Sequence, residues 1–498
     1  MHMPMRNALA AALALAAGAL FTLGLAPFDA WPAAFVSIAA LYLLLQMRAP
    51  VWLAWLYGLG KFGAGASWVY VSIHVYGNAP PLLAGGLVVL FVATLSVLFC
   101  LPIGLMFRRF GSKLSRHRQA MLFVGLYGLM DWLSTWLFTG FPWIFAANGL
   151  LGTYFAGWTP VVGVLGTSLL FAGSAVCLVE MWRAQFARQR AAWAGAVLFP
   201  WALGFILGLI TWVQPLQTVE VALVQGNLDQ ATKWQRDQAI PNLQRHVDLS
   251  EAHWDADILI WPEAAITMYP QQAQTVLDQL SRRGVATETA FISGIPGVER
   301  VEEGYRFQNL ALAMGTARGR FAKHHLVPFG EYVPLESVLR GLIDFFDLPM
   351  SANSPGAADQ PNIQTPFGQI AMAICYEVAY AESLRSAARD AGLLATISND
   401  TWFGTSIGPL QHLQIAQTRA LENGRWLVRA TNNGVTAIVD DQGRVTGQLK
   451  QFTAAVLRGQ VQTMQGRTPF NRFGHWPFLL ALIACLVPAL VVYLRPSK

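Results

Sequence analysis

The segment Ile370-Ala371-Met372-Ala373-Ile374-Cys375-Tyr376-Glu377 is an apolar run of strand length that ends on a thiol and a carboxylate. Similar short apolar or β-branched runs, each ended by polar, Gly or Pro residues, lie at 219–225, 257–261, 290–295, 309–315 and 394–398. Helical stretches separate several of them. This alternation predicts an α/β domain, which we place at residues 214–470.

The sequence on both sides of this domain is strongly apolar. Of the 498 residues, 54% are hydrophobic and 12% are charged, whereas ordinary soluble domains are roughly 25% charged. This composition excludes a plain soluble enzyme, a disordered chain and a coiled coil. Apolar segments near the ~20 residues that a membrane-spanning helix needs lie at 8–26, 31–47, 51–73, 81–106, 119–138, 160–182, 192–213 and 475–494. We therefore expect a seven-span membrane domain at 1–213, and an eighth transmembrane helix with a cytoplasmic tail at 471–498.

The positive charge of the chain follows the same pattern. The net charge is +6, but the polar middle has more acidic than basic residues, so the basic excess lies in the apolar parts. It falls in alternate loops and at the ends, at Arg6, Arg48, Arg108, Arg109, Lys113, Arg116, Arg118, Arg183, Arg188, Arg190, Arg495 and Lys498. Since short cytoplasmic loops collect Lys and Arg, both termini should be cytoplasmic and the α/β domain should lie across the membrane. The first span also resembles a signal peptide, but the alternation fits its retention. We expect no nucleic-acid binding.

The cysteines draw attention to one position. Cys100, Cys177 and Cys485 lie inside predicted spans, which leaves Cys375 alone in the exported domain. A lone thiol in an oxidising compartment is either buried as a small apolar side chain or used in chemistry. The residues around it decide between these readings.

Two other apolar runs also end on polar groups suited to acyl chemistry. Ile258-Leu259-Ile260-Trp261-Pro262-Glu263 ends on a carboxylate, and Phe321-Ala322-Lys323 ends on an ammonium group. Strand ends are where sites collect in α/β sheets. A thiol is mostly protonated at neutral pH, so Cys375 needs a base to become a nucleophile. Glu263 can take that proton and return it to a leaving group, and Lys323 can stabilise an oxyanion, a contribution of typically ~3–4 kcal/mol.

The sequence motifs around these residues resemble those of a known family. They are Trp-Pro-Glu at 261–263, Leu-Val-Pro-Phe-Gly-Glu-Tyr-Val-Pro at 326–334 after Lys323, Cys-Tyr-Glu at 375–377, Asn-Asp-Thr-Trp-Phe-Gly at 399–404 and Arg-Ala-Thr-Asn-Asn-Gly at 429–434. They resemble the nitrilase, or carbon-nitrogen hydrolase, superfamily, and within it the apolipoprotein N-acyltransferase family. Gly-Ala-Ser-Trp-Val-Tyr-Val-Ser-Ile at 65–73 and Gly-Phe-Pro-Trp at 140–143 resemble that family's membrane segment. The resemblance covers nearly the whole chain.

The resemblance implies a four-layer α-β-β-α nitrilase-like domain joined to eight membrane helices. It also implies particular roles for residues that match the family's motifs. The catalytic triad would be Glu263, Lys323 and Cys375, with Glu331 orienting the lysine. Further residues needed for activity or for the lipid-facing pocket would be Tyr376, Glu377, Trp234 and Trp402. For the two Trp residues, aromatic packing at the rim of the domain is the competing interpretation.

The implied reaction is the last step of lipoprotein maturation in the bacterial inner membrane. Cys375 would take an acyl chain from a phospholipid, usually phosphatidylethanolamine, as a thioester. The N-terminal amino group of a diacylglyceryl-cysteine apolipoprotein would then receive the chain, leaving a triacylated lipoprotein and a lysophospholipid. The catalytic domain would be periplasmic. We expect no cofactor, no metal and a monomer.

Several other features have ordinary explanations. Gly58-Leu59-Gly60-Lys61-Phe62-Gly63 matches a dinucleotide-binding pattern but lies within a predicted span and follows no strand, so close helix packing is expected. Lys61 within that span would pair inside the bundle, extend to the interface or contact a lipid phosphate. Asp131 should lie at a wet helix surface or bind within the bundle. His324 and His325 are read as strand residues, without ligand spacing for a metal.

Two other functions compete with acyl transfer. A membrane-tethered amidase would use the same triad and release the acyl group to water, but tethering needs one helix and not eight. A transporter or lipid-binding protein with an inactive domain is disfavoured by the intact Glu263, Lys323 and Cys375. Apolar loops at 141–154 and 339–350 are candidates for contact with the lipid substrate.

Overall fold

A computed structural model describes residues 3–302, 304–334 and 352–494. The chain divides into two compact units. The helical unit comprises Met1–Val69, Leu82–Thr211 and Arg472–Lys498, and the sandwich unit comprises Tyr70–Pro81 and Trp212–Asn471.

The described residues of the sandwich unit form two six-stranded sheets, with strand orders β12-β1-β2-β3-β4-β5 and β11-β10-β9-β8-β7-β6. Neighbours β1, β2 and β3 are parallel, as are β7, β8 and β9, and the remaining pairs are antiparallel. The strands of the first sheet are β1 (Val213–Gln225), β2 (Ile258–Ile260), β3 (Ala290–Val301), β4 (Gly304–Gly315), β5 (Arg320–Ala322) and β12 (Ala455–Gly466). Those of the second are β6 (Ile363–Thr365), β7 (Gly368–Ile374), β8 (Leu393–Ser398), β9 (Leu427–Thr431), β10 (Ala437–Val439) and β11 (Val445–Gln448).

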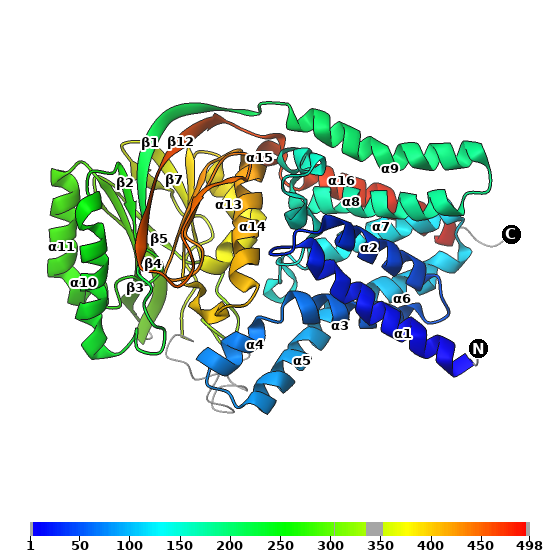
Figure 1. Cartoon of the computed structure of the whole chain (residues 1–498), viewed down its shortest axis with the longest axis horizontal. Helices are drawn as coiled ribbons and strands as arrows, with labels where there is room; N and C mark the ends of the chain where they lie inside the picture. Colours follow the sequence, from blue (N-terminus) through cyan, green and yellow to red (C-terminus); the bar gives the residue numbers. More distant parts are fainter. Residues whose placement is uncertain (1–2, 303, 335–351, 495–498) are drawn as a thin grey trace. The chain divides into compact units, whose positions relative to one another are not determined.

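Helices cover the outer face of each sheet (Figure 1). Helices α10 (Ala239–Ser250) and α11 (Pro270–Ala286) pack on the first sheet, and α13 (Ala381–Ala388) and α14 (Gly408–Asn423) pack on the second. Strand β1 shows how the layers form, because successive side chains of a strand face opposite sides. Val221 and Leu223 lie in the core between the sheets, whereas Ala222 and Val224 face the helices. The expected α-β-β-α sandwich is confirmed.

The helical unit consists of apolar helices with short connections. They are α1 (Met3–Leu20), α2 (Trp31–Leu45), α3 (Pro50–Gly65), α5 (Pro81–Phe99), α6 (Leu101–Phe110), α7 (Arg116–Leu133), α8 (Thr159–Arg183), α9 (Ala187–Gly208) and α16 (Trp476–Leu494). Among the described residues, four helical stretches are long and apolar enough to cross a membrane: Asn7–Gly24, Pro81–Lys113, Tyr154–Arg183 and Ala187–Gly208. Shorter apolar helices are Trp31–Leu45 and Trp476–Val491. The chain is thus a membrane protein, and the full set of eight spans stays a prediction.

Two of the expected spans are shorter or more polar as helices than their sequence runs. The run at 51–73 is continuous helix only in α3, which ends at Gly65. The run at 119–138 is α7 only as far as Leu133, and it contains the buried Asp131 in the last turn of that helix. These features shorten or interrupt the apolar stretch.

Glycines allow α1 and α3 to approach closely. A Cβ on Gly60 would lie 2.1 Å from the carbonyl oxygen of Leu15, and one on Gly18 would lie 1.9 Å from that of Tyr57. Both distances are far below van der Waals contact, so neither position has room for a side chain. The expectation that this glycine pattern serves helix packing agrees with the structure.

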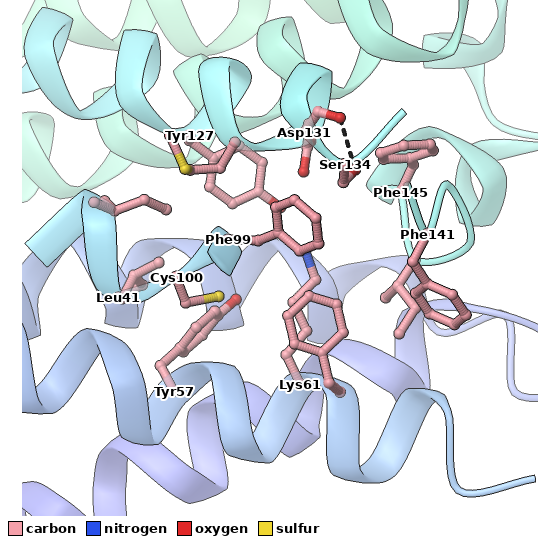
Figure 2. A pocket seen from close by; sticks show the side chains of 14 residues that line it. Leu41, Tyr57, Lys61, Phe99, Cys100, Tyr127, Asp131, Ser134, Phe141 and Phe145 are labelled. Atoms are coloured by element: carbon pink, nitrogen blue, oxygen red, sulfur yellow. Dashed lines mark hydrogen bonds between the residues drawn. The ribbon is translucent and has the colours of Figure 1, made fainter. Parts of the chain in front are cut away.

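Lys61 is buried within the helical unit, where it lines a small cavity together with Tyr127, Asp131 and Ser134 (Figure 2). Its ammonium nitrogen lies 4.4 Å from the centre of the Phe21 ring and 5.5 Å from that of Tyr127. Aromatic faces attract cations. Of the three expected placements, the structure has the lysine inside the bundle, and it buries Asp131 beside the same cavity.

The two apolar loops expected to contact lipid have different outcomes. Most of 141–154 is packed within the helical unit, where Trp143 and Phe145 are buried. The Trp143 ring contacts those of Trp68 and Phe141. Tyr154 at its end is exposed. The segment 339–350 lies outside the described residues.

The close approach of α1 and α3 makes a stability prediction. Gly60→Ala should lower the thermal unfolding midpoint in detergent, since overpacking costs about 1–3 kcal/mol. The matched control is Gly86→Ala in α5, where an added Cβ has nothing within 4 Å. The control should leave the midpoint unchanged or raise it, because Ala favours helix by about 1 kcal/mol. Equal midpoints for the two variants would contradict this account of the packing.

Candidate active site

Glu263 is placed by a tight turn just after β2. Its neighbour Ala264 has φ 47°, in the left-handed region. The turn is backed by Gly294 of β3, where an added Cβ would lie 2.5 Å from the Pro262 carbonyl oxygen and 2.7 Å from the Glu263 Cα. Any larger residue at 294 would displace this backbone, so the direction of the Glu263 side chain depends on that glycine.

The Glu263 carboxylate is buried and fully engaged with donors. The Nδ2 of Asn309 on β4 donates to its Oε1 at 2.6 Å, and the backbone N–H of Asn399, just after β8, donates to its Oε2 at 2.7 Å. The ammonium group of Lys323 lies 3.5 Å from Oε1. Donors from both sheets therefore converge on one carboxylate.

Lys323 follows β5 and is buried, with a side-chain exposure of 1%. Its Nζ lies 2.8 Å from Glu331, whose Oε2 also accepts the backbone N–H of Val327 at 2.9 Å. Burial alone would lower the pKa of Lys323, but Glu331 and Glu263 outweigh burial and raise it. The lysine is therefore a fixed cation throughout the physiological pH range.

Cys375 follows β7 with φ 55°, a conformation that costs a non-glycine residue about 1–3 kcal/mol. Such strain is typical of functional sites. Burial raises the pKa of its thiol, the Glu263 charge raises it further, and Lys323 lowers it by a smaller amount. The structure thus brings the three expected catalytic side chains into one electrostatic cluster, in which the resting sulfur is protonated.

Glu377 joins the Cys375 turn to the Lys323 loop. Its Oε2 accepts the N–H of Ile374 at 2.8 Å, and its Oε1 accepts those of His324 and His325 at 2.6 and 3.0 Å. Burial raises its pKa to about 7, opposed by these backbone donors. The two histidines lie beyond β5, which ends at Ala322, so reading them as strand residues was wrong. Their backbone donors are held by Glu377, which sets the direction of the loop.

A second buried polar cluster lies behind Cys375. The His412 Nε2 lies 3.0 Å from the Cys375 carbonyl oxygen, and the Arg429 guanidinium donates to Asp400 at 2.6 Å. Atoms of Cys375, Asp400 and His412 that could ligate a metal lie within 4.8 Å of one another. However, Arg429 already neutralises Asp400 and would repel a cation, and it also helps burial to lower the pKa of His412. This cluster supports the Cys375 backbone.

The two tryptophans expected to bind substrate are both at least partly exposed in the sandwich unit. Trp234 is 36% exposed, next to the buried Lys233. The Trp402 carbonyl oxygen accepts a hydrogen bond from the Ser72 hydroxyl at 2.7 Å. The centre of the Trp402 ring lies 5.9 Å from that of the Tyr76 ring. Within the described part of the chain, neither indole is hydrogen bonded to the Glu263–Lys323 pair. The residues 70–81 therefore support the Trp402 turn.

Tyr376 is buried directly after the thiol. Its ring centre lies 5.4 Å from that of Tyr380, and burial raises the pKa of its hydroxyl. Tyr380 in turn stacks on His325, with ring centres 3.9 Å apart. An aromatic group thus packs beside the loop that carries Lys323.

Sequence reasoning missed three residues that surround Glu263. They are Asn309, Asn399 and Lys233, and the last donates from its Nζ to the Glu263 carbonyl oxygen at 3.2 Å. Asn309 could have been noticed, since it is the polar residue that begins the apolar run 309–315, although strand β4 itself begins at Gly304. Asn399 begins the Asn-Asp-Thr-Trp-Phe-Gly motif at 399–404, but its contact with Glu263 is made by its backbone N–H. No sequence feature singled out Lys233 apart from its position next to Trp234.

Comparison with known proteins first defines the class. Residues 220–468 match the family model described as carbon-nitrogen hydrolase, which covers the sandwich unit from β1 to β12. Residues 17–177 match the model described as the N-terminal domain of apolipoprotein N-acyltransferase. The chain therefore combines a carbon-nitrogen hydrolase domain with a helical domain that matches this second model.

Full-length relatives narrow the class to one family. The chain is 44% identical to an apolipoprotein N-acyltransferase of Pseudomonas aeruginosa over 494 residues, covering 98% of this chain and 96% of the relative. It is 44% identical to that of Azotobacter vinelandii, covering 95% and 93%, and 39% identical to that of Vibrio vulnificus, covering 93% of each. The chain belongs to the apolipoprotein N-acyltransferase family, as its motifs indicated.

The Glu377 bridge predicts a loss of activity on a neutral substitution. Glu377→Gln replaces one acceptor oxygen by an NH₂ group that opposes a backbone donor, and so shifts the Lys323 loop relative to Cys375. Displacement of this kind costs about 10- to 100-fold in rate. The measurement is the initial rate of acyl transfer, with the exposed Glu302→Gln as control. A Glu377→Gln variant as active as the control would show that the bridge does not position the site.

The protonated resting thiol predicts slow alkylation. At pH 7, iodoacetamide should modify Cys375 at least about tenfold more slowly than a free thiol, because thiolate is the reactive form. The rate, followed by peptide mass spectrometry, should still rise between pH 8 and 10 because the pKa of Cys375 is raised. A rate that levels off below pH 8 would instead indicate a preformed thiolate.

Proposed function

We propose that this protein transfers an acyl chain from a phospholipid, through a thioester on Cys375, to the N-terminal amino group of a diacylglyceryl-cysteine apolipoprotein. Its family relatives carry the name of this activity. The observation that carries the mechanism is the buried Lys323 held between Glu263 and Glu331, beside Cys375.

In the first step, Glu263 takes the proton of the Cys375 thiol as the sulfur attacks the ester carbonyl carbon of the donor. Concerted removal is required because the resting thiol is protonated. Lys323 stabilises the negative oxygen of the tetrahedral intermediate. The carbon–oxygen ester bond then breaks, Glu263 returns the proton to the leaving oxygen, and lysophospholipid departs.

In the second step, the apolipoprotein amine attacks the thioester carbonyl. Glu263 accepts a proton from the amine nitrogen, and Lys323 again holds the oxyanion. The carbon–sulfur bond breaks, the amide forms and the proton returns to the Cys375 sulfur. Every proton thus passes through one carboxylate, which explains why donors from both sheets fix that carboxylate in place.

The helices and charges support the proposed membrane setting. The four long apolar helices found among the described residues support residence in a membrane. The basic loops support cytoplasmic termini and a periplasmic sandwich domain in the bacterial inner membrane. Phosphatidylethanolamine is the proposed donor and a monomer the proposed state. Trp234 and Trp402, both at least partly exposed in the sandwich unit, are proposed to contact the acyl chains of the substrates.

Intact-protein mass spectrometry tests the first step. Purified protein incubated with phosphatidylethanolamine should gain the mass of one acyl chain, which hydroxylamine should remove because thioesters are cleaved by it. Cys375→Ala should gain nothing. Cys177→Ala, which removes a thiol from helix α8, is the matched control and should acylate like the unmodified chain.

Two results would contradict the proposal. Acylation of the Cys375→Ala variant would place the intermediate on another group. A folded protein that gains no adduct, but releases free fatty acid or ammonia from an amide, would favour the amidase alternative.

A further inference from the structure

Lys233 is a second buried lysine beside the proposed catalytic base. It is 1% exposed and lies in the loop between β1 and α10. The backbone N–H of Lys233 donates to the Asp229 carbonyl oxygen at 2.8 Å. The carbonyl oxygen of Lys233 accepts a hydrogen bond from the Asn242 side chain at 3.1 Å. Its Nζ donates to the Glu263 carbonyl oxygen at 3.2 Å. Both backbone groups of Lys233 are therefore hydrogen bonded, and its ammonium group is aimed at the Glu263 peptide.

A buried ammonium group is costly unless it is paired. Lys323 has Glu331 as a close partner, but the charge facing Lys233 is Glu263 itself. The neighbouring His246 of α10 is neutral near pH 7, because burial lowers its pKa to about 4. The loop's Asp229 caps Ala231 with its own carboxylate. Glu263 is therefore the acidic group whose charge bears on Lys233.

Lys233 balances the charges of the Glu263–Lys323–Glu331 cluster, which by itself has one more acidic than basic group. Glu263 and Glu331 carry two negative charges, and Lys323 and Lys233 carry two positive ones. Moving the thiol proton to Glu263 exchanges a carboxylate for a thiolate and leaves this balance unchanged. Without Lys233, the same buried group would hold an excess negative charge, which opposes formation of both the thiolate and the oxyanion.

We propose that Lys233 is a positioning residue, which holds the Glu263 peptide by its carbonyl oxygen and supplies the positive charge that balances the Glu263–Lys323–Glu331 cluster during acylation of Cys375. The inference rests on the proposed role of Glu263 as the base. It adds a fourth charged residue, in a loop of the first sheet, to the machinery of acyl transfer.

This role gives acylation a specific dependence on pH. Burial lowers the pKa of Lys233 to about 8, against the opposing effect of Glu263. The lysine is thus charged below pH 8 and neutral above it. Lys323 stays charged throughout, since its pKa is raised, and Glu377, with a pKa of about 7, titrates on the acid side. Acylation should therefore fall as pH rises through about 8.

The experiment follows single-turnover acylation of Cys375 by intact mass between pH 6 and 9.5. Two donors are used in parallel: phosphatidylethanolamine in detergent and p-nitrophenyl butyrate, which needs no lipid recognition. The variants are Lys233→Met, which removes the charge, and Lys233→Arg, which keeps a charge at every pH used. Lys450→Met, at an exposed lysine, is the matched control.

The proposal predicts that Lys233→Met acylates about 10- to 100-fold more slowly at pH 7 and lacks the fall near pH 8. Lys233→Arg should restore most of the rate and keep it above pH 8, and Lys450→Met should follow the unmodified chain. A structural role alone would lower thermal stability without moving the pH profile.

Other outcomes overturn the proposal. They are an unmodified chain without a fall between pH 7 and 9.5, a fall that persists unchanged in Lys233→Arg, or a Lys233→Met variant with the unmodified profile. If Lys233→Met does not fold, the unmodified chain and Lys233→Arg still decide. Acylation by p-nitrophenyl butyrate but not by phospholipid would reject the proposed donor, while the same profiles would still test Lys233.

Discussion

Lys323 holds a positive charge at 1% side-chain exposure, 2.8 Å from Glu331 and 3.5 Å from Glu263. A buried ion survives only when partners replace the water it has lost, so the surrounding elements are constrained to deliver those partners. Glu331 is in turn held by the Val327 N–H, and Glu263 by Asn309 and the Asn399 N–H. The pairing thereby fixes Glu263, the proposed base, and Lys323, the proposed oxyanion donor, relative to each other before any substrate arrives.

The two-sheet sandwich provides these partners from several chain segments. The strands β2, β5, β7 and β8 each end just before a residue of the site, so a short step past a buried strand delivers Glu263, Lys323, Cys375 or Asn399. Glu377 then joins the loop of one sheet to the turn of the other through backbone N–H groups. Backbone N–H groups hold Glu263, Glu331 and Glu377, so the positions of these three carboxylates are set by the fold of the two sheets.

Much of this arrangement is predictable from sequence, for a physical reason. The runs before Glu263 and Cys375 are apolar throughout because strands buried on both faces must be, and a polar residue at their end marks the sheet edge. Glu331 and Glu377 were predicted from their match to the family's sequence motifs, whereas their contacts become visible only in the fold. Asn309 and Lys233 were missed because they are near Glu263 in space and not in sequence. Asn309 lies on β4, two strands away from β2 in the sheet, and Lys233 follows β1, which pairs with β2. The β1–β12 pairing, between residues about 240 apart in the chain, is likewise invisible to local patterns.

The helical unit also shows what a local sequence pattern cannot predict. Hydropathy marked the long apolar helices correctly, but a composition pattern does not reveal that α3 ends at Gly65 or that residues 70–81 group with the sandwich unit. Ser72 and Tyr76 of that segment contact Trp402. The position of a segment between two apolar runs therefore says little about the unit that it packs with.

The central claim is that one buried cluster both makes a thioester and passes it to an amine. The most direct measurement isolates the acylated protein, removes the phospholipid and adds a diacylglyceryl-cysteine peptide in a single turnover. The account predicts that the chain leaves Cys375 as an amide on the peptide, much faster than it leaves as fatty acid when the peptide is absent. Release of free fatty acid at the same rate with and without the peptide would contradict it.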